Sequence, residues 1–254
     1  MGYLHQGHLS LVTKAKSVSD VSVVSIFVNP SQFSPEEDLK TYPRNFERDE
    51  DLLMKLGVDA VFYPDESEIY PPDFQTYVTV DHLSKLWEGR SRPAHFRGVA
   101  TIVNKLFNII KPHAAVFGQK DAQQAEIIKR MVKDLDMDIE IIINPIVRES
   151  DGLAMSSRNV YLNLDERKDA LVLFEALQKA ETLIKEGEVD CSLIINRMNM
   201  ILRSASSARP DYAAIVNEKN FESTEILEKG NKYYILIACY IGKTRLIDNF
   251  LVDC

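Results

Sequence analysis

Hydrophobic positions in the first part of the chain follow strand-like and helix-like spacing in turn. Residues 21–28 form a β-branched apolar run that ends at Asn29-Pro30, which predicts a buried parallel strand followed by a loop. Residues 47–56 predict a helix, and residues 58–63 predict a second strand. This order of strand, helix and strand favours a parallel sheet.

The most regular predicted helix runs from about residue 98 to residue 110. Its apolar residues repeat with helical spacing and share one face: Val99, Ile102, Val103, Leu106, Phe107 and Ile110. Residues 114–117 predict a short buried strand, the chain then turns into another helix, and residues 139–143 predict a further strand. The βαβα order predicts an α/β fold with a doubly wound, Rossmann-like parallel sheet.

The pattern changes after about residue 148, so we expect two domains, residues 1–148 and residues 149–254. Asp165 begins a predicted long helix that Gly187 ends, and Asp190 caps another helix. Three strands then follow, over residues 212–216, 233–241 and 245–247. The second domain is therefore expected to be a small α+β cap with an antiparallel sheet.

Composition narrows the class of protein. The chain has 254 residues, 45% of them hydrophobic and 27% charged, which is typical of a soluble globular protein. A net charge of −8 argues against general nucleic-acid binding, and no apolar run approaches the roughly 20 residues that a membrane-spanning helix requires. No signal peptide is visible, and three cysteines without paired spacing favour reduced thiols in a cytoplasmic protein.

The start of the chain carries the strongest chemical signal. His5 and His8 flank Gly7 immediately before an apolar helix, whose positive N-terminal end attracts anions. Two imidazoles in this position are typical of a site for nucleotide phosphates. A metal site is the alternative, but it needs a third ligand, and the other histidines and cysteines lack suitable spacing. No metal ligand is therefore predicted.

Three other clusters are candidates for chemistry. Lys120 lies in a strand-to-helix turn, where an ammonium can reach phosphate oxygens, although a solvated loop lysine is the ordinary interpretation. Asp121 and Gln124 have capping-box spacing, so Gln124 either caps its helix or contacts a ligand. Residues 155–159 form either a phosphate-gripping loop or a polar turn, and residues 87–92 form either a substrate wall or an exposed basic loop.

Taken together, the strings that carry these candidates resemble the pantothenate synthetase (pantoate–β-alanine ligase) family of the nucleotidylyltransferase-like HIGH superfamily. The resemblance extends over most of the chain. It rests on residues 1–8 (MGYLHQGH), 27–33 (FVNPSQF), 42–44 (YPR), 92–99 (RPAHFRGV), 117–124 (FGQKDAQQ) and 148–159 (RESDGLAMSSRN). Residues 245–249 (RLIDN) also resemble the family near its C-terminus.

The resemblance implies an ATP-dependent ligase that joins pantoate to β-alanine through pantoyl adenylate, with release of AMP and pyrophosphate, in pantothenate and coenzyme A biosynthesis. His8 would be the proton donor, with His5 and Lys120 as further catalytic residues. ATP would be held by Met1, Gly2, Tyr3, Leu4, His5, Gln6, Gly7, His8, Gly118, Gln119, Lys120, Asp121, Val147, Met155, Ser156, Ser157 and Arg158. Pantoate would be held, or its site lined, by Gln32, Gln124, Asn29, Tyr42, Glu88 and Arg92. The family also implies Mg²⁺ accompanying ATP, and a homodimer.

Two departures from the family pattern lead to further expectations. Family members carry another strand and helix and a Pro-Thr approach before the Met-Gly of the first motif, so we expect the sheet here to lack one strand. Ala94 stands where the family usually has glycine, which would shift His95 and Phe96 if that position needed a positive φ. The alternatives are another adenylyl- or cytidylyltransferase, and a nucleotide-binding or assembly protein with impaired catalysis.

Overall fold

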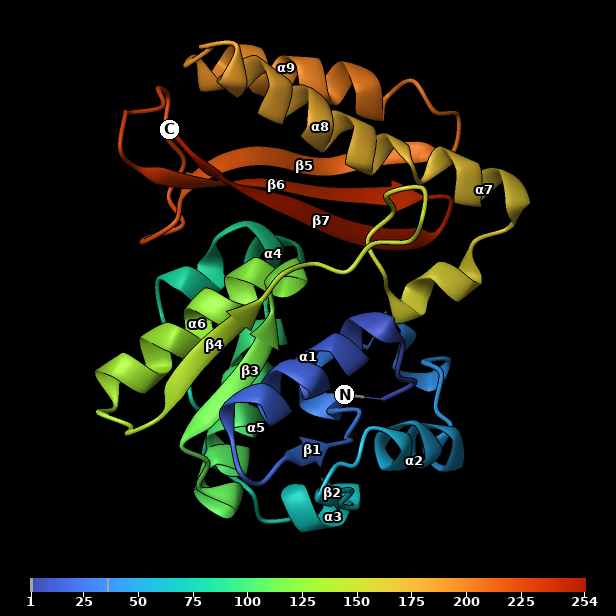
Figure 1. Ribbon diagram of the computed structural model, residues 1–254, viewed down its shortest axis with the longest axis vertical. Coiled ribbons are helices and arrows are strands. Elements are labelled where there is room, and N and C mark those ends of the chain that lie inside the picture. Colours follow the sequence, from blue (N-terminus) through green and yellow to red (C-terminus); the bar gives the residue numbers. More distant parts are fainter. Residues whose placement is uncertain (1, 36) are drawn as a thin grey trace. The chain divides into compact units, whose positions relative to one another are not determined.

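The computed structural model describes residues 2–35 and 37–254, and the chain divides into two compact units, Met1–Pro145 and Ile146–Cys254. The first unit carries all of the parallel strands among the described residues (Figure 1). Its elements are α1 (Gln6–Val18), β1 (Val23–Ser25), η1 (Pro30–Gln32), η2 (Asp38–Lys40), α2 (Phe46–Lys55), β2 (Ala60–Phe62), α3 (Glu66–Ile69), η3 (Leu83–Lys85), α4 (Trp87–Ser91), α5 (His95–Ile110), β3 (Ala114–Gly118), η4 (Gln119–Asp121), α6 (Ala122–Asp134) and β4 (Glu140–Asn144).

The strands of the first unit are parallel, as predicted, but over the described residues they form two pairs rather than one continuous sheet. β1 pairs with β2, with Val23 opposite Ala60, and β3 pairs with β4, with Ala114 opposite Glu140. The strand predicted over residues 21–28 is shorter than expected. Its partner ends at Phe62, whose carbonyl accepts the last hydrogen bond from Ile26 N–H at 2.9 Å, so the ladder stops there.

Apolar cores hold the described part of the first unit together. One core lies between α5, α6 and the β3–β4 pair, and it contains the predicted apolar face of α5 except Ile110. A second core joins α1 to β1 and α2 through Val12, Val24, Ile26 and Leu53. These contacts bury one face of each helix, so the helix starts are held at the strand ends where polar residues cluster.

The second unit is a three-stranded antiparallel sheet with two helices on one face (Figure 1). Its elements are η5 (Ser157–Tyr161), α7 (Leu164–Asp169), α8 (Val172–Lys185), α9 (Cys191–Leu202), β5 (Ala208–Asn217), β6 (Lys232–Ile241) and β7 (Thr244–Asp253). The antiparallel sheet was predicted, as was the cap by Asp190, whose carboxylate accepts from the N–H groups of Ser192 and Leu193.

The prediction of a single helix from Asp165 to Gly187 is wrong in one respect. The chain forms two helices, and tight turns join them: Leu171 N–H bonds to the Lys168 carbonyl at 3.1 Å, and Leu173 N–H bonds to the Ala170 carbonyl at 3.3 Å. Ala170 is fully buried at this break, so packing rather than local propensity sets the bend.

No helix in the described part of the chain combines the length and apolar character needed to cross a membrane.

Candidate active site

The turn that begins α1 places two imidazoles side by side. His5 Nδ1 accepts from Gly7 N–H at 3.1 Å, and His8 Nδ1 accepts from His5 N–H at 3.3 Å, which forms a capping box. Since Nδ1 of each ring is an acceptor, the proton of each neutral imidazole lies on Nε2. The ring centroids are 3.9 Å apart. The helix start therefore offers two adjacent Nε2–H donors.

The His8 ring is neutral at pH 7. Burial lowers its pKa to about 2, and the electrostatic effects of His5 and Lys120 lower it in the same direction. A neutral imidazole still donates a hydrogen bond from Nε2, although it does not carry a positive charge. An anion bound beside the ring would oppose these effects and raise the pKa, which is the change that a phosphate site requires.

Two adjacent residues of α2 hold the chain just before His5. Asp49 is 1% exposed, and its carboxylate accepts from Leu4 N–H at 2.7 Å. Arg48 donates to the Leu4 carbonyl at 2.8 Å and lies over the Tyr3 ring, 4.8 Å from its centroid. The Leu4 backbone is thus fixed through both its N–H and its carbonyl. The sequence analysis missed this pair, whose only local signal is an aspartate on the apolar face of a helix.

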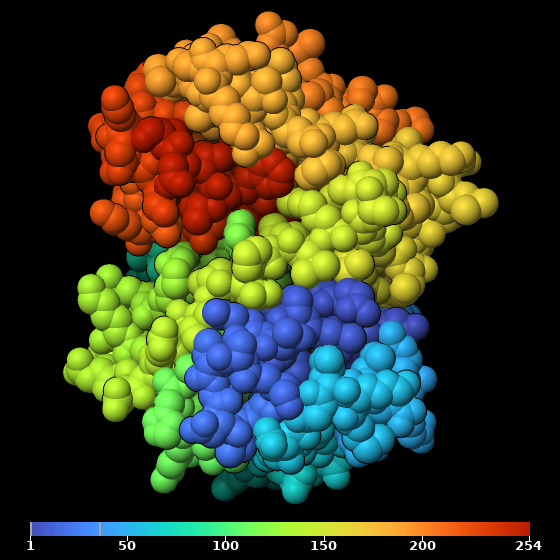
Figure 2. Space-filling model, in the orientation of Figure 1, coloured from blue at the N-terminus to red at the C-terminus, as the bar shows by residue number. Residues whose placement is uncertain are grey.

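The carboxyl ends of β3 and β4 lie against α1. Asn144, at the end of β4, donates to Ser10 Oγ at 3.1 Å, and a Cβ atom on Gly118 would lie 3.8 Å from the Leu11 side chain. η4 follows Gly118 directly and contains Lys120, whose charge acts on His8. The structure therefore brings together the predicted residues of the first turn and of the Gly118–Asp121 turn. Atoms of the N-terminal segment, in blue, lie at the surface on the face shown in Figure 2.

Asn29 organises the loop that follows β1. It is 3% exposed, and its Nδ2 donates to the Gly98 carbonyl and to Gln32 Oε1, both at 3.1 Å. Its Oδ1 accepts from Ser31 N–H at 3.3 Å, from Ser31 Oγ at 2.8 Å and from the Tyr70 hydroxyl at 2.8 Å. The predicted residues Asn29 and Gln32 are thus in contact. Tyr70, which lies far away in sequence, joins them.

The backbone of Gln32 is held by His95, which the sequence analysis did not assign to the site. His95 Nδ1 lies 3.0 Å from the Gln32 carbonyl, and its Nε2 lies 3.2 Å from Arg92 Nη1. Burial lowers the pKa of His95 to about 4, as does the positive charge of Arg92, so the ring is neutral at pH 7. Nδ1–H then donates to Gln32, and Nε2 accepts from Arg92. Arg92 also forms an ion pair with Glu37, with 3.0 Å from Nε to Oε2.

The condition under which Ala94 would shift this region, a positive φ, is not met. Ala94 has a φ of −91°, so the position does not need the conformational freedom of glycine. It is the residue that precedes α5, and its carbonyl accepts from Gly98 N–H at 3.2 Å in the first turn. His95 and Phe96 are both buried in that turn.

The structure separates the roles of two neighbouring glutamines. Asp121 makes no side-chain hydrogen bond to the start of α6, so Gln124 does not complete a capping box with it. Gln123 is the buried residue, at 4% exposed, and its side chain bonds to three backbone groups: the carbonyls of Leu83 and Leu86, at 2.8 and 2.9 Å, and the N–H of Glu88, at 3.0 Å. Gln124 is partly exposed beside it.

Glu88 and Tyr42 complete the predicted pantoate set. Glu88 is buried in α4, where its N–H is held by Gln123. The Tyr42 ring packs edge-on against Phe33, with 5.9 Å between centroids, directly after the Asn29–Gln32 loop. Met1, the first residue predicted to contact ATP, lies outside the described residues. Gly2, Tyr3, Leu4, Gln6 and Gly7 surround the histidine turn.

The predicted ATP residues of the second unit form a compact turn. Met155 N–H donates to the Val147 carbonyl at 3.0 Å, and Ser156 Oγ accepts from Arg158 N–H at 3.2 Å, which caps η5. Ser157 is buried. Arg148 anchors the segment that leads to this turn, because its guanidinium binds both oxygens of Asp248, at 2.6 and 2.9 Å. The ordinary role of a polar turn and a phosphate-binding role are both compatible with this geometry.

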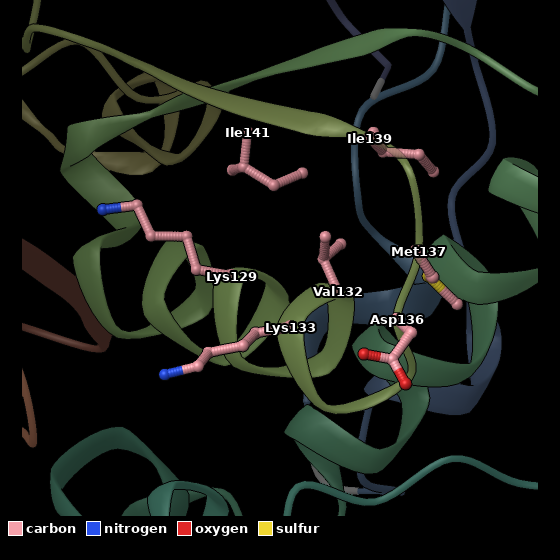
Figure 3. Close-up of a pocket in the computed structure, with 7 residues that line it drawn as sticks. All are labelled: Lys129, Val132, Lys133, Asp136, Met137, Ile139 and Ile141. Atoms are coloured by element: carbon pink, nitrogen blue, oxygen red, sulfur yellow. The ribbon is translucent and has the colours of Figure 1, made fainter.

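An open hollow of about 410 Å³ lies elsewhere on the first unit, between the end of α6 and β4 (Figure 3). Val132, Ile139 and Ile141 meet there, and the ammonium groups of Lys129 and Lys133 extend to one side. Its lining residues are separate from all of the predicted site residues.

Among the residues that the structure describes, no group of three or more His, Cys, Asp or Glu side chains could hold a metal ion.

Comparison with known proteins shows which family this chain is similar to. Residues 1–251 match the profile of the Pantoate-beta-alanine ligase family. The pantothenate synthetase of Thermotoga neapolitana is 56% identical over 252 residues, which cover 99% of this chain and 89% of that protein. A crystal structure of pantothenate synthetase from Thermus thermophilus is 44% identical with a TM-score of 0.94, over 98% of this chain and 90% of that chain.

A crystal structure of pantoate-beta-alanine ligase from Francisella tularensis, complexed with beta-gamma ATP and beta-alanine, is also similar. It is 37% identical to this chain with a TM-score of 0.80, over 99% of this chain and 87% of that chain. These similarities extend over the residues of both units, so they do not rest on a single motif.

Proposed function

This chain belongs to the pantoate-beta-alanine ligase family, and we propose that the family's ATP-dependent ligation takes place beside the His5–His8 turn, at the carboxyl ends of β3 and β4. Open α/β folds bind ligands at this edge of their parallel strands. The observation that carries the proposal is the pair of Nε2–H donors at the start of α1, next to Lys120. This donor set suits phosphate oxygens.

In the first step, a pantoate carboxylate oxygen attacks the α-phosphorus of ATP and pyrophosphate leaves, which gives pantoyl adenylate. Negative charge grows on the phosphate oxygens as this happens, and Lys120 with the two imidazoles stabilises it. His8 begins the step as a neutral hydrogen-bond donor, because its pKa is lowered, and the polyphosphate raises that pKa. In the second step, the amine of β-alanine attacks the acyl carbon and AMP leaves.

The substrate assignments form two sets of residues. ATP is assigned to residues 2–8, residues 118–121, Val147 and Met155–Arg158. Pantoate is assigned to Gln32 and Gln124, with Asn29, Tyr42, Glu88 and Arg92 around them. Asn29 and Gln32 share a hydrogen bond, and Arg92 lies within 3.4 Å of the Gln32 carbonyl, which supports one pantoate cluster.

Three further assignments accompany this function. Mg²⁺ would accompany ATP and would supply positive charge to its phosphates, while the histidine and lysine donors of this chain suit anions rather than a cation. The chain forms a homodimer, which sedimentation would detect. Its location is the cytoplasm, which is supported by the free thiols of Cys191, Cys239 and Cys254.

The function is tested by measuring AMP and pantothenate formation from ATP, pantoate and β-alanine, with each substrate omitted in turn. We expect His8→Ala and Lys120→Ala each to lower the single-turnover rate of adenylate formation by about 100-fold or more, because each removes preorganised charge stabilisation. Melting temperatures should stay close to that of the parent.

His82→Ala and Lys129→Ala are the matched controls, since His82 is exposed and Lys129 pairs with Glu126 on α6. Both should keep the parental rate. A folded His8→Ala or Lys120→Ala protein with a near-parental single-turnover rate would remove that residue from the proposed mechanism. AMP formation that does not depend on pantoate would contradict the proposed first step.

A further inference from the structure

A chain of hydrogen bonds leads from the Tyr70 hydroxyl, at the end of α3, to the side chain of Gln32. We propose that Tyr70 is a positioning residue that acts through Asn29 and presents Gln32 to pantoate as a hydrogen-bond donor. This inference rests on the proposed function, which places pantoate at Gln32. Tyr70 itself touches Asn29 and Ser31.

The orientation of the Asn29 amide is set by two backbone groups. The N–H of Ser31 can only donate, and it lies 3.3 Å from one side-chain atom of Asn29, which must therefore be Oδ1. The carbonyl of Gly98 can only accept, and it lies 3.1 Å from the other atom, which must be Nδ2. The two amide atoms of Asn29 are thus distinguished by their partners.

This orientation decides which end of the Gln32 amide points toward Asn29. Asn29 Nδ2 has a second proton, and it lies 3.1 Å from the Gln32 side chain, so the Gln32 atom that meets it is the acceptor Oε1. The Nε2 group of Gln32 is then the end that remains for a ligand. An NH₂ group donates, so it recognises acceptors such as the carboxylate and hydroxyl oxygens of pantoate.

Tyr70 holds the Asn29–Gln32 loop through hydrogen bonds from outside that loop. Its hydroxyl donates to Asn29 Oδ1 at 2.8 Å and lies 2.9 Å from Ser31 Oγ. Burial raises the pKa of the phenol, so the hydroxyl remains a protonated donor at neutral pH. The ring packs edge-on against Phe74, with 5.1 Å between centroids, and Lys105 lies 5.9 Å from the ring centre. The other bonds to Asn29 Oδ1 come from Ser31, two residues along the same loop, so Tyr70 supplies the tether to α3.

The first test is Tyr70→Phe, which removes the hydroxyl and keeps the ring. We expect KM for pantoate to rise about fivefold, with kcat and the KM for ATP within about twofold of the parent, as for the loss of one hydrogen bond of about 1 kcal/mol. Tyr63→Phe is the matched control, because Tyr63 is exposed and stacks on Phe46 away from this loop. It should leave all three constants unchanged.

A double-mutant cycle with Gln32→Ala separates this inference from the function on which it rests. If Tyr70 acts through Gln32, adding Tyr70→Phe to Gln32→Ala should cause no further rise in the KM for pantoate. Gln32→Glu keeps the shape and removes the donor, so it should be at least as harmful as Gln32→Ala. If Gln32 instead accepts a hydrogen bond from a pantoate hydroxyl, Gln32→Glu would bind pantoate better than Gln32→Ala, which would overturn the donor assignment.

The remaining outcomes are also distinct. If Gln32→Ala leaves the KM for pantoate unchanged, the proposed pantoate site is wrong and the inference falls with it. If Gln32→Ala raises that KM while Tyr70→Phe matches Tyr63→Phe, or if the two effects multiply, only the role of Tyr70 is overturned. Should Tyr70→Phe fail to fold by thermal melting, Ser31→Ala replaces it in the double-mutant cycle, because it removes another donor to Asn29 Oδ1. A rise in the KM for pantoate that Gln32→Ala abolishes would support positioning of Gln32 through Asn29, and an unchanged KM would overturn it.

Discussion

At the scale of single residues, the adjacent glutamines at the start of α6 show how burial divides structural from chemical roles. Gln123→Ala would leave two carbonyls and one N–H without their side-chain partner in a buried region. We expect it to lower the free energy of unfolding by about 3 kcal/mol, since it removes three buried hydrogen bonds, each of which contributes about 1 kcal/mol. Denaturant titration followed by circular dichroism would measure this.

Gln124→Ala is the matched comparison, because it removes the same side chain from the next, partly exposed position. We expect it to change the free energy of unfolding by less than about 0.5 kcal/mol and to raise the KM for pantoate more than that for ATP. The opposite pattern, lost stability with an unchanged KM for pantoate, would show that Gln124 is the structural residue and is not part of the pantoate site.

At the scale of elements, the contact between α5 and the Asn29–Gln32 loop depends on Gly98. A Cβ atom there would lie 2.3 Å from the Ser31 carbonyl oxygen and 2.6 Å from the Gln32 nitrogen, both backbone atoms that have little room to move. The absence of a side chain therefore lets the helix approach closely enough for the Gly98 carbonyl to accept from Asn29.

Gly98→Ala should force α5 and this loop apart. We expect a loss of stability of about 3 kcal/mol, together with weaker pantoate binding, because the Asn29 and His95 bonds both cross this contact. Gly118→Ala is the control for stability, since its Cβ atom would meet Leu11 at an ordinary 3.8 Å and its φ is −83°. A Gly98→Ala protein as stable as Gly118→Ala would show that the helix does not need this close approach.

At the scale of the whole molecule, two neutral histidines make stability depend on pH. The pKa of His95 is lowered to about 4 and that of His8 to about 2, from an ordinary value of 6.5. As the pH falls below 6.5, the unfolded chain binds protons that the folded chain does not. The free energy of unfolding should then fall by about 1.4 kcal/mol per pH unit for each histidine, down to about pH 4 for His95.

His95→Gln should therefore flatten this dependence. Between about pH 5.5 and 4.5, the slope of the free energy of unfolding against pH should be smaller than that of the parent by about 1.4 kcal/mol per pH unit. Denaturant titrations at several pH values give both slopes. His82→Gln, which replaces an exposed histidine, should keep the parental slope. If His95→Gln keeps it as well, His95 does not resist protonation in the folded protein.

Much of this molecule follows from local spacing in the chain. The apolar repeat of α5, the cap at Asp190 and the order of parallel strands are local patterns, and each is found in the structure. The histidine turn is also local, because His5 and His8 bond to backbone groups within three residues of themselves. Such features depend on interactions between near neighbours, which a sequence displays directly.

The partners of the site residues were decided only by tertiary structure. Asn29 meets Tyr70, Leu4 meets Asp49, and the Gln32 carbonyl meets His95, each across more than 40 positions of sequence. The end of β1 and the break between α7 and α8 were also set by a partner strand and by packing. No spacing within a single segment encodes such contacts, because they exist only after separate helices and strands have packed together. The sequence by itself thus determined which residue types stand at the site, and tertiary packing decided how they are held.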